Sequence, residues 1–465
     1  MQLFAQVMGE TTLIVITSVI LATVFATLCL PYLKHIASIT ETLNLLNTET
    51  LLFLLAVVII VTLLAGLYPA LILSGFNPAL ALKNKITSAT VGGISLRRGL
   101  VIIQFAISQV LIIGTIIAIC QMNFVRSADL GFNKEAIFVM SANADSAMVS
   151  RQNAFKQKLI QIPGIQSVSF SNDVPSSDNN WSTNFKYNHQ LEPDFHLYMK
   201  FADEDYFKTY GLRLIAGRVY TKSDTTNEVV VNETLIKKLG IKNPNEVIGK
   251  EIGMGRWKKI VGVVKDFKTN SLREEIKPTM IAEKRSQYGT TGIKLRSSNI
   301  SQTRAAIQSA WDEFFPEYAY SSSFMDENIE KFYKQEDQLA LLYKIFAAIA
   351  IFISCLGLYG LVSFMAVQRT KEIGVRKVLG ATVANIIYLF SKEFTLLILV
   401  AFLLAGPAAY FMMNNWLENF KFRINITAGV FIIAVLLSLI IAWISVGYRS
   451  IKAAIANPVK SLRSE

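Results

Sequence analysis

Six long stretches of this 465-residue chain are apolar and contain few or no charged residues, and this feature restricts the fold more than any other. They lie at about 12–33, 51–74, 99–122, 345–367, 394–413 and 428–448. Each is long enough to cross a hydrocarbon core about 30 Å thick as a helix. The composition agrees, because 52% of the residues are hydrophobic and only 17% are charged. We therefore predict an α-helical membrane protein with about six transmembrane helices.

The formal net charge of +12 belongs mainly to the membrane part. Acids and bases are nearly balanced in residues 123–337, whereas bases gather between the second and third stretches, after the fourth and after the sixth. By the positive-inside rule these three basic segments face the cytoplasm. Both termini are then predicted to be cytoplasmic and 123–337 to be extracytoplasmic. Nucleic-acid binding is disfavoured, because no soluble part has its bases gathered in a patch.

The extracytoplasmic stretch alternates segments typical of strands with segments typical of helices, which predicts one large α+β domain. Strand patterns occur at 136–140, 167–170, 228–232, 259–264 and 279–282. Helix patterns occur at 149–161, 233–239 and 300–314, the last with Ser298 or Asn299 as its N-cap.

No residue pattern in the chain indicates catalysis, a metal or a cofactor, so we expect a protein that is not an enzyme. The three histidines have no metal-ligand spacing, and the three cysteines all lie in apolar stretches. The acidic run 203–205 lacks the ligand spacing of a calcium loop and is interpreted as a solvated turn. The sequence has no GxxxxGK[ST] motif, so ATP would have to be hydrolysed by another chain.

A basic segment follows the fourth apolar stretch and reads QRTKEIGVRKVLGAT over 368–382. Glu372 precedes Arg376 by one helical turn, the favourable order for an ion pair, and apolar residues recur at helix spacing as far as Phe390. This predicts an amphipathic helix over 368–387 on the inner membrane surface. On spacing alone, an interfacial helix whose bases meet lipid head groups is the favoured interpretation.

Residues 369–381 resemble the signature of the FtsX/MacB-type ABC transporter permeases. The extracytoplasmic stretch is similar to the MacB-like periplasmic core domain of that family in several short motifs. They are DYFKTYGL at 205–212, AGR at 216–218, NETLIKKLG at 232–240, IGK at 248–250 and GVVKDFK at 262–268, followed by Pro278. The resemblance covers about 97–465.

The resemblance implies a permease subunit in a bacterial inner membrane that transmits the motion of a separate ATPase to its extracytoplasmic domain, for export or for lipoprotein or peptide handling. The expected partners are that ATPase, a second permease module or a second copy of the chain, and membrane lipid. The residues expected to couple to the ATPase are Arg369, Lys371, Glu372, Ile373, Gly374, Arg376, Lys377, Leu379 and Gly380. The cargo cannot be read from these residues.

Two other functions are alternatives for a chain of this kind. The first is a membrane-anchored sensor or regulator of a cell-envelope enzyme, which would share this fold without transport. The second is an ion- or solute-coupled transporter, which is disfavoured because the apolar stretches contain no chain of ionisable residues.

The chain also repeats one segment, since YPALILSGFNPALALK at 68–83 and YRSIKAAIANPVKSLR at 448–463 align without a gap. Residues 1–85 therefore resemble the last two helices of a preceding FtsX-like module. The second module would comprise a linker and first helix at 86–122, the extracytoplasmic domain at 123–337, and three helices with the coupling segment at 338–465. With one coupling segment, the chain is expected to dimerise or to need a further module.

The distribution of bases generates a test of topology. In a cysteine-free background, single cysteines near Ser177 and Gln287 should react with an impermeant maleimide in intact cells, whereas cysteines near Thr90 and Ser464 should not. Labelling at Thr90 from outside would contradict the six-helix arrangement.

Overall fold

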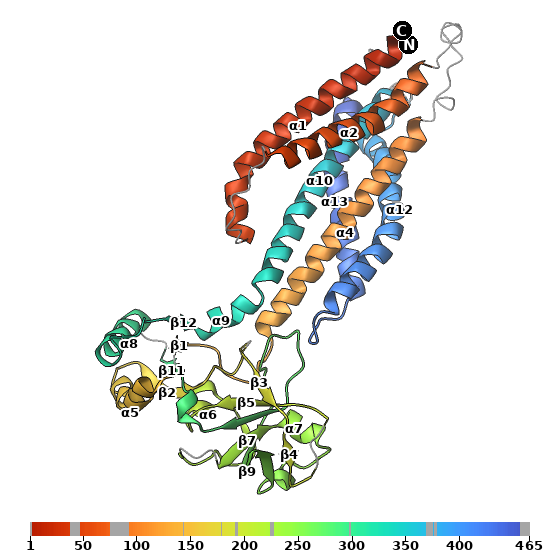
Figure 1. The fold of residues 1–465 in the computed structure, drawn as a ribbon. Coiled ribbons are helices and arrows are strands. Elements are labelled where there is room, and N and C mark those ends of the chain that lie inside the picture. Colours follow the sequence, from red (N-terminus) through yellow and green to blue (C-terminus); the bar gives the residue numbers. More distant parts are fainter. Residues whose placement is uncertain are drawn as a thin grey trace. The chain divides into compact units, whose positions relative to one another are not determined.

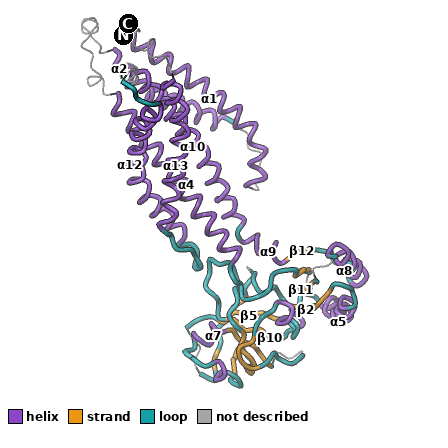
Figure 2. Tube along the Cα trace, turned by 180° about the vertical axis from the view of Figure 1, so that it is seen from behind, coloured by secondary structure: helices purple, strands orange, loops and turns teal. Residues whose placement is uncertain are grey.

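The computed structural model describes residues 2–37, 47–74, 93–142, 144–177, 179–190, 194–223, 227–296, 299–368, 375 and 379–455. It forms two compact units. The first unit comprises Met1–Thr115, Gln338–Ala409 and Thr427–Glu465, and the second comprises Ile116–Asp337 and Tyr410–Ile426. Every described strand lies in the second unit (Figures 1 and 2).

In the part of the chain that the structure describes, six helices are long and apolar enough to cross a membrane, which confirms the predicted number. They are α1 (Gln2–Ala37), α2 (Thr48–Ser74), α4 (Gly93–Ser127), α10 (Lys334–Gln368), α12 (Val383–Leu417) and α13 (Ala428–Ile455). Three helices begin about three turns before their apolar stretches, because polar residues continue each helix. They are α1, α10 and α12, which begin at Gln2, Lys334 and Val383. The three cysteines lie within these helices and are free.

Four of the helices in the first unit share one apolar core. Its buried side chains include Phe105 of α4, Leu358 of α10, Phe394 of α12 and Ala442 of α13. Polar contacts add to this packing: the hydroxyls of Ser108 and Ser354 lie 2.8 Å apart, and Gln109 donates to the carbonyl of Ile398 at 3.3 Å. Such bonds are the usual way to satisfy polar groups between helices in lipid.

The second unit is an α+β domain with two sheets. A four-stranded sheet has the order β12-β1-β11-β2, and an eight-stranded sheet has the order β3-β5-β10-β7-β9-β8-β4, with β6 paired to β9. The strands are β1 (Ile137–Ser141), β2 (Ile165–Ser171), β3 (Trp181–Thr183), β4 (Lys186–Tyr187), β5 (Leu197–Phe201), β6 (Leu214–Gly217), β7 (Glu228–Asn232), β8 (Glu251–Met254), β9 (Arg256–Val264), β10 (Thr279–Ala282), β11 (Thr290–Leu295) and β12 (Ser322–Phe324). The helices are α5 (Ser146–Ile160), α6 (Tyr206–Tyr210), α7 (Glu233–Lys238), α8 (Ile300–Phe314) and α9 (Met325–Phe332).

The central strands of the two sheets are buried on both faces. In β1, Phe138 and Met140 enter one core, which α5 and α8 cover, whereas Ile137 and Val139 enter a second core on the opposite face. The continuous Val229–Val231 run of β7 is buried for the same reason, since strands covered on both faces contain apolar residues without alternation. All five predicted strands and all three predicted helices are present.

Two motif glycines lie opposite each other where β6 crosses β9. Gly217 pairs with Gly262, and a Cβ on either would approach a backbone oxygen of the other strand to 2.2 Å. Gly217 also has a φ of +69°, which other residues rarely adopt. The glycines of the AGR and GVVKDFK motifs therefore allow this close approach.

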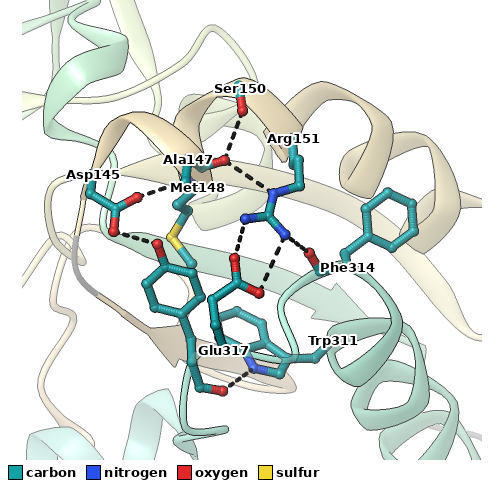
Figure 3. A network of polar contacts seen from close by, with 9 residues as sticks. Asp145, Ala147, Met148, Ser150, Arg151, Trp311, Phe314 and Glu317 are labelled. Carbon is teal, nitrogen blue, oxygen red and sulfur yellow. Dashed lines mark hydrogen bonds and ion pairs between the residues drawn. The ribbon is translucent and has the colours of Figure 1, made fainter.

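A polar network joins α5 to the end of α8 (Figure 3). Asp145 caps α5 by accepting from the amide of Met148 at 2.8 Å, and it also accepts from the hydroxyl of Tyr318. Arg151 donates to the carbonyl of Phe314 at 2.6 Å and pairs with the carboxylate of Glu317. This network fixes the two helices side by side over the first core.

Three expectations about single residues are wrong. Asp203 is not solvated but 5% exposed, because it accepts from the Ser169 hydroxyl at 2.7 Å and pairs with Lys156 at 2.7 Å. Asn299 is at the N-cap position of α8, but it has a φ of 60° and its side chain makes no capping bond; Ser298 lies outside the described residues. Ser177 is buried, so the topology label near it belongs on its exposed neighbour Asn179.

The Lys156–Asp203 pair generates a prediction about stability. Burial raises the pKa of Asp203, and Lys156 limits this rise. Lys156→Met should lower the free energy of unfolding by about 3 kcal/mol at pH 7, because an unpaired carboxylate would remain buried. In this variant the folded state holds the Asp203 proton more tightly than the unfolded state, so stability should recover as the pH falls through the raised pKa.

Denaturant unfolding followed by tryptophan fluorescence from pH 7 to pH 4 would measure this. Lys158→Met is a matched control on the same helix, because Lys158 pairs with Glu313 at the surface. A variant at position 156 that behaves like the control at every pH would contradict the assignment.

Candidate functional site

Most of the predicted ATPase-coupling residues lie outside the described residues: Arg369, Lys371, Glu372, Ile373, Gly374, Arg376 and Lys377. Two are described. Leu379 is 80% exposed and Gly380 has a φ of +90°. An exposed leucine beside a basic segment is compatible with a docking surface, and its role remains a prediction.

The predicted helix over 368–387 is not continuous. Residues 379–380 form a turn, and α12 begins at Val383. Gly380 has a positive φ, which is incompatible with a continuing helix, and the hydroxyl of Thr382 accepts from the amide of Asn385 at 3.3 Å in the manner of an N-cap. These stop and start signals are visible in the sequence, although the apolar stripe continues across them.

Within the second unit, one loop of the α+β domain bonds to the ends of the membrane helices. We call this loop, residues 268–275, the joint loop. Its first contact is with the start of α10, where the hydroxyl of Tyr333 accepts from the amide of Leu272 at 2.7 Å. One turn further along, Glu336 is 1% exposed and pairs with the guanidinium of Arg273. The joint loop is thus held to the start of α10 by a hydrogen bond and by an ion pair whose carboxylate is buried.

The joint loop also bonds to the connection between α12 and α13, residues 418–427. The amide of Phe422 donates to the carbonyl of Leu272 at 3.1 Å, and the amide of Lys421 donates to the carbonyl of Arg273 at 3.2 Å. The Lys268 ammonium lies 2.9 Å from the centre of the Phe422 ring, as a cation–π contact. An exposed ion pair between Lys421 and Glu275 adds a fourth contact.

The outer end of α4 completes the arrangement. Gln121 is fully buried, and its amide donates to the carbonyl of Phe422 at 3.1 Å and accepts from the amide of Ile424 at 3.0 Å. Just beyond α4, the carbonyl of Leu130 accepts from the amide of Lys268 at 2.8 Å. All of these partners belong to the second unit.

The second core of the α+β domain includes apolar side chains from the same helix ends. Met122 and Val125 of α4, Tyr333 before α10 and Phe420 after α12 pack with Ile137, Tyr206, Val264 and Ile281. Burial of this kind is worth about 25 cal/mol for each Å² of apolar surface. Displacing a helix end relative to the sheets would therefore open an apolar core.

Burial also changes the ionisation of the joint. It lowers the pKa of Lys268 to about 8, although Asp266 and Asp129 oppose this effect. It raises the pKa of the Tyr333 phenol, which therefore stays neutral and available for its hydrogen bond. Charged Lys268 is thus partly desolvated beneath Phe422.

Sequence patterns did not reveal this site. The signal that was available is the set of glutamines in the apolar stretch of α4, of which Gln121 bonds to the α12–α13 connection. The motif residues Asn232 and Asp266 have structural tasks instead. Asn232 caps α7 through the amide of Leu235, and Asp266 accepts from the amide and hydroxyl of Thr234. Among the described residues, no group of histidine, cysteine and carboxylate side chains could hold a metal.

Comparisons with known proteins match two family models to the chain. The MacB-like periplasmic core domain matches residues 103–310, and the FtsX-like permease C-terminal domain matches residues 344–458. The first range includes the joint loop, and the second includes α12 and α13.

Similar proteins include a macrolide export ATP-binding/permease protein MacB from Aggregatibacter actinomycetemcomitans, 28% identical over 42% of this chain and 32% of its own length. The uncharacterized ABC transporter permease YvrN from Bacillus subtilis is 25% identical over 57% of this chain and 69% of its own length. The chain thus spans about a third of the MacB relative. The crystal structure of the periplasmic region of MacB from Actinobacillus actinomycetemcomitans covers 43% of this chain and 94% of its own, with 17% identity and a TM-score of 0.31.

The buried carboxylate of Glu336, paired with Arg273, leads to a prediction about stability. Arg273→Met should lower the free energy of unfolding of the second unit by about 2 kcal/mol, because Glu336 would lose its charged partner without access to water. Adding Glu336→Met should restore most of that loss, since two apolar side chains replace the pair. Thermal unfolding of the full chain in detergent would measure both effects.

Lys421→Met provides the control, because its pair with Glu275 is exposed on both sides and should leave the melting temperature nearly unchanged. If the double variant were no more stable than Arg273→Met alone, the two side chains would not act as a pair.

Proposed function

We propose that this chain, an FtsX/MacB-type ABC transporter permease by its matches at 103–310 and 344–458, transmits the motion of a separate ATPase to its extracytoplasmic domain. The contacts between the joint loop and the helix ends are the observation that supports this proposal most. Helices α4, α10 and α12 each continue from the first unit into the second, where their ends bond to a single loop and pack into one core. A shift of the helices along the membrane normal would therefore reach the sheets directly.

The distribution of charge supports motion rather than conduction. In the described parts of the six candidate spans, ionisable side chains lie mainly toward the helix ends, as Arg98 and Glu393 do in their mutual ion pair. Proton or ion pathways normally need a series of such residues at membrane depth. The helices are instead held together by serine and glutamine contacts.

On the cytoplasmic side, we assign ATPase docking to residues 369–380. This segment combines four bases with Glu372, and it lies between α10 and α12, which both continue into the second unit. ATP would be bound and hydrolysed by a separate nucleotide-binding subunit, since the P-loop motif does not occur in this sequence. Both termini would be cytoplasmic in a bacterial inner membrane, and a second permease module or a second copy would supply the other docking segment.

The matches are to permeases, which favours the transport assembly over the membrane-anchored regulator. The activity that we propose is export, or the handling of lipoproteins or peptides.

Charge reversal in the docking segment tests this function. Glu372→Lys and Arg376→Glu should each reduce co-purification of the ATPase and the ATP hydrolysis stimulated by the permease, by about tenfold if a charge-assisted contact is lost. Membrane insertion should not change, because the segment lies outside the apolar stretches.

Lys208→Glu, an exposed charge reversal on α6 in the extracytoplasmic domain, is the control and should leave both quantities unaltered. If both cytoplasmic variants kept wild-type ATPase binding, the segment would be an interfacial helix that meets lipid, and the docking role would be wrong.

A further inference from the structure

The eight-stranded sheet has an open groove of about 450 Å³, and no residue of the joint loop lines it. The floor is formed by Phe201 of β5 and Met280 of β10, which belong to the first apolar core. Met199, Met254 and Trp181 form the apolar sides. Strands β5 and β10 are paired here, and Met199 of β5 lies opposite Met280 of β10. On the other side of β5, Trp181 of β3 lies opposite the same Met199.

The groove exists because the β8–β9 hairpin extends beyond its neighbour. Strand β7 pairs with β9 only from Lys259 onward, so Arg256 and Lys258 pair with β8 alone. The hairpin turns at Gly255, whose φ is +80°. The protruding tip thus forms one wall of the groove and presents its first residues to it.

Three cations converge on this apolar surface: Arg256, Lys258 and Lys284. Among the described residues none of them pairs with a carboxylate. Burial, then Arg256 and Lys284, lower the pKa of Lys258, which means that the three charges are close enough to repel one another. Lys284 lies 5.2 Å from the centre of the Phe201 ring, where the cationic and apolar parts of the groove meet.

Like charges held together beside a half-buried apolar surface cost free energy that a bound anion would recover. Methionine side chains are flexible and polarisable, and they are frequent where a surface accepts apolar chains of varied shape. The groove volume lies within the range of about 300–1,000 Å³ of small-molecule sites. The lining therefore combines an apolar half with an anion-attracting half.

We propose that this groove binds an anionic amphiphile, a molecule with an acyl chain and a carboxylate or phosphate head. The chain lies along Trp181, Met199 and Met254 over the floor, and the head lies against Arg256, Lys258 and Lys284. Binding here requires neither the ATPase nor the docking segment, so the site stands independently of the proposed transmission function.

Photoaffinity labelling of the full chain in phosphatidylcholine nanodiscs tests the site. The probe is a palmitic acid with a diazirine on its chain, and mass spectrometry locates the labelled peptides. Label is expected in the segments that contain Trp181, Met199, Met254 and Met280. Unlabelled palmitate and hexadecyl phosphate serve as competitors, and whichever is stronger identifies a fatty acid or a phosphate-headed lipid as the source.

The variant Arg256→Glu, Lys258→Glu, Lys284→Glu should reduce labelling about tenfold or more. Lys208→Glu, Lys242→Glu, Lys250→Glu reverses three exposed charges elsewhere in the same unit and should label like the wild type. If the first variant unfolds, as judged by circular dichroism, the corresponding glutamine variant replaces it and should still label several-fold less.

Three results would overturn the proposal. One is equal competition by hexadecyltrimethylammonium, because the cations would then play no part. Another is labelling confined to the membrane helices. The third is displacement of the probe by an acidic aromatic peptide at lower concentration than by palmitate or hexadecyl phosphate, which would make the groove a peptide site.

Discussion

Within the second unit, the ion pair between Arg273 and the buried Glu336 joins the start of α10 to the α+β domain, beside the hydrogen bond between Tyr333 and Leu272. Glu336 lies in the first turn of a membrane helix and is almost inaccessible to water. Arg273 is its only charged partner among the described residues, so the helix cannot move away from the joint loop without exposing or stranding a carboxylate. The neighbouring backbone bonds from Phe422 and Lys421 connect the same loop to the α12–α13 connection.

The strands and the helix ends of the second unit share one apolar core. The second core includes residues of α4, of the segment before α10 and of the segment after α12, as well as the inner faces of β1, β9 and β10. Packed cores resist continuous deformation and shift as units. A movement of the helices is therefore expected to displace the sheets, while the α5–α8 network keeps the far side of the four-stranded sheet rigid.

The sequence predicted elements that have a local period and missed contacts that have none. Long apolar stretches located six helices, and valine-rich runs located β7 and β9, because burial on both faces needs such runs. The joint depends on the amide of Gln121, the hydroxyl of Tyr333 and carbonyls far apart in the chain, which no spacing rule links. Gly380 and Thr382 are typical of a helix end and a helix start, so the break in the predicted coupling helix was visible in the sequence. The apolar stripe that continues across them favoured one uninterrupted helix instead.

Hydrogen–deuterium exchange would measure whether the joint loop passes motion from the membrane helices to the sheets. The complex with its co-purifying ATPase would be compared with and without Mg-ATP, in the wild type and in an Arg273→Met, Gln121→Leu variant that keeps ATPase binding. In the wild type, we expect nucleotide to change the deuterium uptake of β1 and β11. In the variant, we expect at least half of this change to be lost, while the uptake of α10 and α12 still responds to nucleotide. An undiminished change in β1 and β11 of the variant would contradict it.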